Sequence, residues 1–326
     1  MVSRARALAA IFWTALENLE ISVIVPTRNR ARSLADTLAS LARQSLPRSR
    51  YEVVVVDNGS TDTTAELAGS TLGREGLHGR CVREPALGAN LARNRGIEDS
   101  KGKIVAFLDD DARAEPPWLE ALLSAFSDGC VNGVGGAIEL LWQTAPPRWQ
   151  HRNYLHLLAQ FDLGAERRKV ERYPYLVSTN LAFTRQTFDR FGVFDPRLDR
   201  RGSQLLSMGD TEYCHRVVRG GGTLFYEPRA VVRHLVPEDR TRLSFLLRRS
   251  YSNGRSLCQL KNLWRDLDAE PSRPASLVRT GVNLLREVRK RNLAGCARQA
   301  SLLAWHLGYL REALLTRTPP ASPLPH

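Results

Sequence analysis

Residues 104–120 read IVAFLDDDARAEPPWLE, an apolar run that ends in three consecutive aspartates. The run is short and wholly apolar, which is typical of a strand buried on both faces of a sheet. The prolines that follow favour a helix start, so the stretch predicts a strand, a polar turn and a helix. Adjacent carboxylates at the end of a central strand repel one another unless a cation lies among them. The aspartate triplet is therefore the first candidate for a functional site.

The same strand-then-helix pattern precedes this stretch. Apolar runs at 21–26 (ISVIVP) and 51–57 (YEVVVVD) each end in a polar turn, and helical apolar spacing follows both. Short apolar strands that alternate with helices predict βαβ units, an α/β fold and a mostly parallel, Rossmann-like central sheet flanked by helices. Ligands of such sheets bind beyond the carboxyl ends of the strands, where this chain places polar residues at 27–29, 57–59 and 109–111.

The second half of the chain has a looser pattern. It predicts a short strand and a helix within 175–198, a helix at 209–222 that glycines end, and two short strands within 223–236. A helical region begins near residue 242, and helical spacing resumes after a proline-containing break at 270–276.

Bulk composition bounds the protein class. The 326 residues are 43% hydrophobic, enough to bury the core of one large or two small domains. The five cysteines form no C-x-x-C pair, which argues against a zinc cluster or a disulfide framework and fits a reducing compartment. No uncharged apolar run approaches the roughly eighteen residues that span a bilayer. The first twenty residues are interpreted as an amphipathic helix, not a signal peptide.

Positive charge is concentrated toward the end of the chain. The net charge is +13, and from residue 237 onward 16 Lys/Arg face 7 Asp/Glu. Apolar residues at helical spacing with arginines between them, at 275–315, predict weak peripheral attachment to an anionic membrane. Burial against the catalytic domain or in a dimer is the alternative. Nucleic-acid binding is disfavoured, because Trp264 and Trp305 suit helix packing.

Six motifs in order resemble family 2 glycosyltransferases with the GT-A fold. ISVIVPTRNR, VVVVDNGSTDTT, GANLARNRG and FLDDDA look like the donor-side signatures, and TNLAFTRQTFDRFGVFD and GDTEYCHRV look like the acceptor-side and catalytic acidic segments. The resemblance covers roughly residues 20–255. It implies metal-dependent, inverting transfer of a sugar (a hexosyltransferase-type reaction) from a nucleotide-diphosphate donor to a hydroxyl acceptor. A UDP-sugar is the favoured donor, and a saccharide or lipid-linked acceptor in cell-surface polysaccharide or glycolipid synthesis is expected.

The resemblance also assigns donor-binding residues. Pro26, Thr27 and Arg28 would lie along the base and ribose, and Asp57 would accept a hydrogen bond from the base. Arg93 would approach the base or the phosphates. An Asx-turn is the structural alternative for Asp57, and an exposed helical arginine is the alternative for Arg93.

The aspartate triplet would hold a divalent metal, Mn²⁺ or Mg²⁺. By resemblance Asp109 and Asp110 would reach the ribose side, and Asp111 would be the direct ligand in an Asp-x-Asp motif shared with Asp109. His234, after a predicted strand, would complete the site, since imidazole suits Mn²⁺. A solvated turn and a structural histidine are the alternatives.

Inversion needs one general base, and Asp210 is the candidate. It stands in the first turn of a predicted helix, where the positive end of the dipole keeps a carboxylate ionised. The family usually has Glu-Asp here, whereas this chain has Gly209-Asp210, so the role of the first acidic residue is in doubt. Glu212 is the second choice for the base, and an N-cap aspartate is the structural alternative.

Other functions fit less well. A dinucleotide oxidoreductase needs G-x-G-x-x-G after the first strand, and PTRNRARS contains no glycine. A nucleotidyltransferase would open with a Gly-rich signature and a lysine. A nucleotide-sugar-binding protein that has lost catalysis would have lost Asp210, which is present. That binding protein, or a basic nucleic-acid-binding or membrane-binding protein, is the alternative function.

The predicted organisation has four parts. They are a helical lead-in at 1–20, a GT-A domain at 21–255 (donor half 21–135, acceptor half 136–255), a basic helical extension at 256–316 and a tail at 317–326. Arg248, Tyr251 and Arg255 form either a diphosphate or acceptor clamp or a solvated helix face. We expect a cytoplasmic protein, peripheral on the inner face of the membrane.

Overall fold

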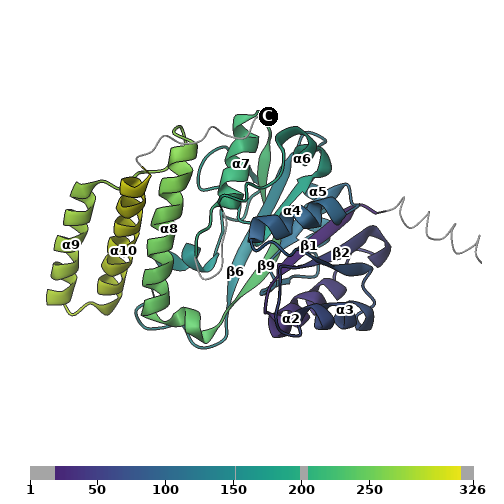
Figure 1. Cartoon of the computed structure of the whole chain (residues 1–326), viewed down its shortest axis with the longest axis horizontal. Coiled ribbons are helices and arrows are strands. Elements are labelled where there is room, and N and C mark those ends of the chain that lie inside the picture. Colours follow the sequence, from purple (N-terminus) through teal and green to yellow (C-terminus); the bar gives the residue numbers. More distant parts are fainter. Residues whose placement is uncertain (1–18, 151, 199–204, 317–326) are drawn as a thin grey trace, which may run out of the picture.

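A single mixed sheet forms the centre of the molecule, with helices on both faces (Figure 1). The computed structural model describes residues 19–150, 152–198 and 205–316, so the predicted lead-in helix and tail lie almost wholly outside it. Within these residues the strand order is β3-β2-β1-β4-β8-β6-β9-β5, and β7 pairs with β9. The strands are β1 (Ile21–Thr27), β2 (Tyr51–Asp57), β3 (Gly79–Arg83), β4 (Ile104–Leu108), β5 (Ala112–Ala114), β6 (Gly133–Trp142), β7 (Arg168–Lys169), β8 (Asn180–Thr184) and β9 (Leu224–Val236).

The first half of the sheet is parallel, as predicted. β1 pairs in parallel with both β2 and β4, and β3 pairs in parallel with β2. The chain therefore runs outward from β1 to β3 and then returns to place β4 on the other side of β1. This reversal of strand order opens a crevice at the carboxyl ends of β1 and β4, where α/β sheets bind ligands.

The second half of the sheet is mixed. β8 is antiparallel to both β4 and β6, and β6 is parallel to β9. The prediction of two short strands within 223–236 is wrong, because β9 is one strand of 13 residues whose register shifts opposite Gly136 and Ala137. Pro228 lies in the shifted segment, and proline cannot donate a ladder hydrogen bond, so it interrupts the strand pattern in the sequence without ending the strand.

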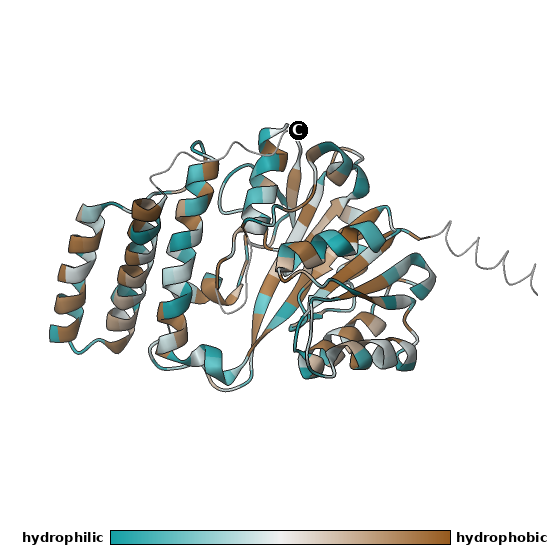
Figure 2. Ribbon diagram, in the orientation of Figure 1, coloured by the Kyte–Doolittle hydropathy of each residue, from teal (hydrophilic) through white to brown (hydrophobic). Residues whose placement is uncertain are grey.

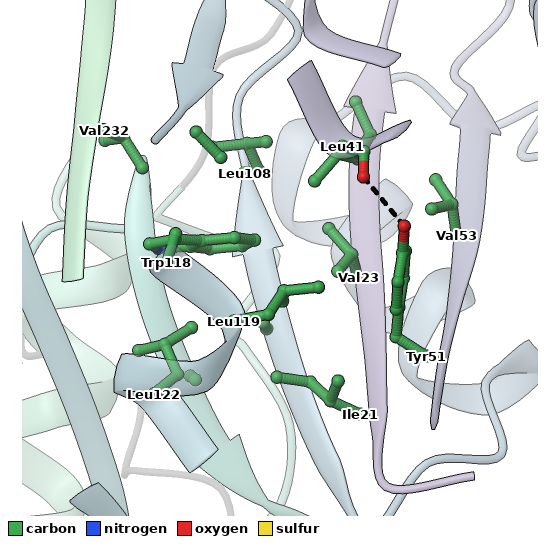
Figure 3. Packing of buried hydrophobic residues seen from close by; sticks show 14 of the residues in the cluster. Ile21, Val23, Leu41, Tyr51, Val53, Leu108, Trp118, Leu119, Leu122 and Val232 are labelled. Atoms are coloured by element: carbon green, nitrogen blue, oxygen red, sulfur yellow. Dashed lines mark hydrogen bonds between the residues drawn. The ribbon is translucent and has the colours of Figure 1, made fainter. Parts of the chain in front are cut away.

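Alternating strand side chains give the sheet two apolar faces. Val23 packs with α2, α3 and α5, whereas Ile24 packs with α4, α6 and α7. On the first face Trp118 is fully buried among Leu108, Leu119 and Val232 (Figure 3). The helices are α2 (Ala31–Ala42), α3 (Thr64–Arg74), α4 (Ala89–Asp99), α5 (Trp118–Ala125), α6 (Arg185–Phe191) and α7 (Gly209–Arg219), with short 3₁₀ turns η1 (Arg48–Arg50), η2 (Arg152–Leu158) and η3 (Glu238–Thr241).

Three further helices, α8 (Leu243–Leu263), α9 (Pro274–Arg289) and α10 (Leu293–Leu315), stand side by side beyond the sheet, with α9 outermost (Figure 1). α8 and α10 approach closely, because a Cβ at Gly254 would lie 2.0 Å from the carbonyl oxygen of Trp305 and one at Gly308 would lie 2.0 Å from that of Tyr251. The predicted boundary at 255/256 falls inside α8. No helix in the described part of the chain is long and apolar enough to cross a membrane.

Candidate active site

A cleft of about 980 Å³ opens at the carboxyl ends of β1 and β4 and extends to α8 and α10. Most of the site residues predicted from the sequence line it, although they come from five separate segments. These residues are Pro26, Thr27, Arg28, Arg93, Asp109, Asp110, Asp111, Asp210 and His234. Asp57 is not among the lining residues.

Asp111 is the most heavily contacted carboxylate in the cleft. It is 6% exposed, and its Oδ1 lies 3.2 Å from Nε2 of His234. Its Oδ2 accepts from Nη2 of Arg240 at 2.9 Å and from Nη1 of Arg30 at 3.5 Å. Burial by itself raises the pKa of Asp111, but His234, Arg240 and Arg30 outweigh it and hold that pKa well below its ordinary value. The carboxylate is therefore ionised at neutral pH.

The sheet register brings His234 to this position. β5 begins one residue after Asp111, and its Ala112 pairs directly with His234 of β9. Asp109, Asp111 and His234 consequently offer ligand atoms that all lie within 4.8 Å of one another. Two carboxylates and an imidazole are a donor set that suits Mn²⁺ and is compatible with Mg²⁺. The residues present thus fit the divalent metal that the sequence predicts.

Asp110 differs from its neighbours. It accepts a hydrogen bond from Oγ1 of Thr27 at 2.7 Å. Burial and the adjacent Asp111 charge raise the pKa of Asp110 to about 7, against the lowering effects of Arg30 and Thr27. Of the three aspartates, Asp110 is therefore the one most easily protonated and the poorest candidate for a metal ligand.

Asp109 faces the other side of the cleft. Its Oδ2 accepts from Oγ1 of Thr179 at 2.5 Å, and its Oδ1 lies 3.8 Å from Nη2 of Arg93. Arg93 also donates to Oδ1 of Asn90 at 2.8 Å and to Oγ of Ser178 at 3.0 Å. Arg93 is therefore an oriented cation at the cleft wall, its side chain only 12% exposed, and the alternative of an exposed helical arginine does not hold.

Asp57 lies beneath a turn outside the cleft lining. Its Oδ1 accepts from the backbone N–H of Ser60 at 3.1 Å, which is the Asx-turn considered as its structural role. Its neighbour Asn58 lines the cleft and holds the loop before α4, accepting from the N–H of Gly88 at 2.8 Å. The contact of Asp57 with a donor base stays a prediction.

Asp210 is the second residue of α7 and lines the cleft. Met208, the residue before the helix, has φ 85°, a left-handed conformation that is uncommon outside glycine and that turns the chain sharply into the helix. Oδ2 of Asp210 accepts from the N–H of Ser178 at 3.0 Å, and Oδ1 accepts from the N–H of Thr211 at 2.8 Å. Both bonds fix the orientation of the carboxylate that is the candidate general base.

Glu212 does not reach the cleft. It is 2% exposed, its carboxylate accepts from Arg216 at 2.8 Å, and it accepts from Nε1 of Trp264 at 3.2 Å. This pairing makes it a structural anchor between α7 and the segment after α8. Asp210 is left as the acidic residue of α7 in the cleft.

Gly209 makes room for Asn90. A Cβ at Gly209 would lie 2.2 Å from Nδ2 of Asn90, closer than side-chain contacts allow. Nδ2 of Asn90 donates to the carbonyl of Asp195 at 2.8 Å, and its Oδ1 accepts from Arg93. The carboxamide of Asn90 thus fills the space that the first acidic side chain of the family's usual Glu-Asp pair would need.

Several cleft residues were not predicted from the sequence: Arg30, Ser178, Thr179 and Arg240. Arg30 and Thr179 lie within motifs recognised in the sequence, and Ser178 directly precedes one. Their position along the sequence next to predicted site residues could therefore have identified them. Arg240 belongs to none of the motifs recognised in the sequence, and the turn η3 brings it to Asp111.

The predicted clamp residues on α8 behave differently from one another. Arg248 is exposed and lines the cleft, and Tyr251 lies beside it in the lining. Arg255 also lines the cleft, but its Nε donates to Oε2 of Glu312 on α10 at 2.7 Å. Arg255 therefore joins two helices.

The fold recurs in solved glycosyltransferases. The mannosyltransferase PcManGT from Pyrobaculum calidifontis, solved in complex with GDP-Man and Mn²⁺, superposes with a TM-score of 0.63 over 92% of this chain and 88% of its own, at 22% identity. S. aureus TarS 1–349 in complex with UDP gives a TM-score of 0.50 at 17% identity, covering 91% of this chain and 92% of its own. The predicted GT-A fold is confirmed.

Sequence comparison points the same way. Glycosyltransferase AglE of Haloferax volcanii is 31% identical over 209 residues, which cover 63% of this chain and 64% of AglE. Succinoglycan biosynthesis protein ExoM of Rhizobium meliloti is 29% identical over 248 residues, 74% of each protein. Residues 22–192, just over half of the chain, match the family model described as "Glycosyl transferase family 2". The chain belongs to glycosyl transferase family 2.

Proposed function

We propose that this protein is a metal-dependent, inverting glycosyltransferase that moves a sugar from a nucleotide-diphosphate donor to a hydroxyl acceptor in glycan synthesis. One observation carries the proposal. The candidate metal ligands Asp109, Asp111 and His234 share a single cleft with the candidate base Asp210, at the switch in strand order where α/β sheets bind nucleotides.

Asp109, Asp111 and His234 would hold Mn²⁺ or Mg²⁺, which when bound supplies Lewis-acid stabilisation of the departing diphosphate. Pro26, Thr27 and Arg28, at the end of β1, line the same cleft. Arg28 is exposed there, and a guanidinium pairs well with phosphate oxygens. A UDP-sugar is our preferred donor.

Asp210 would remove the proton from the acceptor hydroxyl as that oxygen attacks the anomeric carbon. The N–H groups of Ser178 and Thr211 hold the carboxylate in place. A base held at this helix start, in the cleft that the metal ligands also line, would act on the face opposite the leaving group, as inversion requires.

The acceptor would be a saccharide or a lipid-linked sugar presented at an anionic membrane. Brown, apolar positions recur along α9, the helix farthest from the sheet (Figure 2). Val278 and Leu285 are each 67% exposed on that helix, and Arg286 and Arg289 are exposed beside them. An apolar stripe with flanking arginines suits the interface of an anionic bilayer.

The test is release of nucleoside diphosphate from a panel of nucleotide sugars, with and without Mn²⁺ and acceptor. Asp111→Ala should abolish metal-dependent donor binding, because it removes one of the three candidate metal ligands and the one that contacts His234. Asp210→Asn should leave donor binding near normal while transfer falls by about a hundredfold or more.

The outcomes separate the rival functions. Donor binding without turnover in the wild type would identify a binding protein that has lost catalysis. Transfer that survives in Asp210→Asn would contradict the base assignment, and transfer in the presence of a chelator would contradict the metal.

A further inference from the structure

Arg240 lies at the candidate metal ligands although it belongs to a connecting turn. It stands in η3, between β9 and α8, and its side chain is 14% exposed. Its Nη2 donates to Oδ2 of Asp111 at 2.9 Å, and its Nη1 lies 3.3 Å from Nε2 of His234. One guanidinium thus contacts the two most buried of the three candidate ligands.

These contacts make contradictory demands on His234. Asp111 Oδ1, 3.2 Å from Nε2, accepts hydrogen bonds and therefore calls for a proton on Nε2. Arg240 only donates, so it calls for a lone pair on the same nitrogen. The other ring nitrogen, Nδ1, is buried and has no hydrogen-bond partner among the described residues. No single tautomer of His234 satisfies both neighbours.

A cation that accepts the lone pair of Nε2 would remove this conflict. With the proton on Nδ1, Nε2 and Oδ1 of Asp111 can both serve as ligands, as metal-binding imidazoles and carboxylates do. Arg240 now contacts Nε2 of His234 and the second carboxylate oxygen, Oδ2, of Asp111. Arg240 and a divalent metal therefore compete for Nε2 of His234 and for the negative charge of Asp111 and, because both are cations, for the same space.

We propose that Arg240 is an exchangeable counter-cation of the metal site: it neutralises Asp111 before metal binds and withdraws from the ligands when metal binds. The inference rests on the proposed metal dependence. On withdrawal Arg240 remains in the cleft, which it lines together with Arg28 and Arg248. There its planar guanidinium is suited to pair with the diphosphate of the donor, so the lost contact with Asp111 is offset by a new contact with phosphate oxygens.

The experiment measures Mn²⁺ affinity of the full chain without donor, from the electron paramagnetic resonance signal of free Mn²⁺. Arg240→Gln removes the competitor and should bind Mn²⁺ about tenfold more tightly than the wild type. Arg248→Gln removes the same charge from the same cleft without touching Asp111, and it should leave Mn²⁺ affinity almost unchanged. Arg240→Lys, which keeps the charge but loses the fork, should fall between.

A second readout reports on the fold. Arg240→Gln should melt at a lower temperature than the wild type without metal, because Asp111 loses its nearest cation, and Mn²⁺ should raise its melting temperature by more. At saturating Mn²⁺ the same variant should bind nucleoside diphosphate more weakly.

Two failures are distinguishable. Mn²⁺ binding that Asp111→Ala abolishes, but that Arg240→Gln does not strengthen relative to Arg248→Gln, would overturn the exchange and leave the metal site standing. Absence of Mn²⁺ binding in both the wild type and Arg240→Gln would overturn the proposed metal dependence and the exchange together.

Discussion

The hydroxyl of Thr27, at the end of β1, donates a hydrogen bond to Asp110, just beyond the end of β4, over 2.7 Å. This bond spans the point at which the strand order reverses, and it ties the two walls of the crevice together. It links the loop that carries Arg28 to the aspartate triplet, so these two groups of cleft residues are held together.

Thr27→Val keeps the shape of the side chain and removes this bond. We expect donor affinity to fall by about tenfold, since an uncompensated buried carboxyl disturbs the triplet, while turnover at saturating donor changes little. Isothermal titration with nucleoside diphosphate and Mn²⁺ measures the loss. Thr27→Ser, which retains the hydroxyl, is the control, and equal weakening by both variants would contradict the role of the bond.

Gly209 and Asn90 should behave as one unit. Gly209→Ala places a Cβ against Asn90, so it should lower the free energy of unfolding by about 1–3 kcal/mol. In an Asn90→Ala background, where the space is free, the same change should have almost no effect. Urea unfolding of the wild type, the two single variants and the double variant gives the coupling free energy between the two positions. If the two single losses in the free energy of unfolding add up to the loss in the double variant, the residues are independent.

Glu52 should make the fold sensitive to acid. Its buried carboxylate accepts from Ser22 at 2.7 Å, from Arg80 at 2.6 Å and from the N–H of Lys101 at 2.7 Å. Burial raises the pKa of Glu52, but these partners outweigh it and lower the pKa below 4.5. The unfolded chain therefore takes up the proton first, so this stabilisation is complete above about pH 5 and is lost as the pH falls through the folded-state pKa.

Glu52→Gln tests this directly. The variant should be about 2 kcal/mol less stable at neutral pH, and its stability should fall less steeply than that of the wild type below about pH 5. Urea unfolding followed by circular dichroism across this range measures both effects. Glu66→Gln, at an exposed position on α3, should reproduce the wild-type curve.

Membrane attachment should depend on α9. The double variant Val278→Ser, Leu285→Ser removes exposed apolar groups without touching the core, so it should stay folded and lose flotation with anionic vesicles. Val193→Ser, at a residue 42% exposed near α6, is the matched control and should float like the wild type. If α9 instead forms a dimer contact, sedimentation will show a change in oligomeric state with no flotation by any variant.

The sequence predicts the parallel half of the sheet well, because β1, β2 and β4 are short, mostly apolar runs of the kind that is buried on both faces of a sheet. It fails at β9, where Pro228 breaks the pattern and the bulge absorbs it. Asp111 could be identified from its place after a strand, and His234 by resemblance. That they meet follows from the pairing of Ala112 with His234, a long-range register that local sequence does not encode.

Arg240 and Asn90 illustrate the limit more sharply. Each is an ordinary polar residue in a loop or on a helix, and its role comes from a partner far along the chain: Asp111 for Arg240, and Gly209 for Asn90. The missing acidic residue at 209 could be read from the sequence as a departure. Its cause, the space taken by Asn90, could be found only from the packing of α7 on α4.

The close crossing of α8 and α10 bears on how the enzyme can be engineered. Besides the close contacts at Gly254 and Gly308, the Oγ atoms of Ser250 on α8 and Ser301 on α10 lie 2.6 Å apart. Ala304 and Leu307 of α10 form part of the cleft lining. Deleting the chain from about residue 270 would therefore strip a wall from the cleft as well as the apolar stripe of α9. A minimal catalytic fragment, or a chimera that borrows this cleft, would have to keep α10 to remain competent.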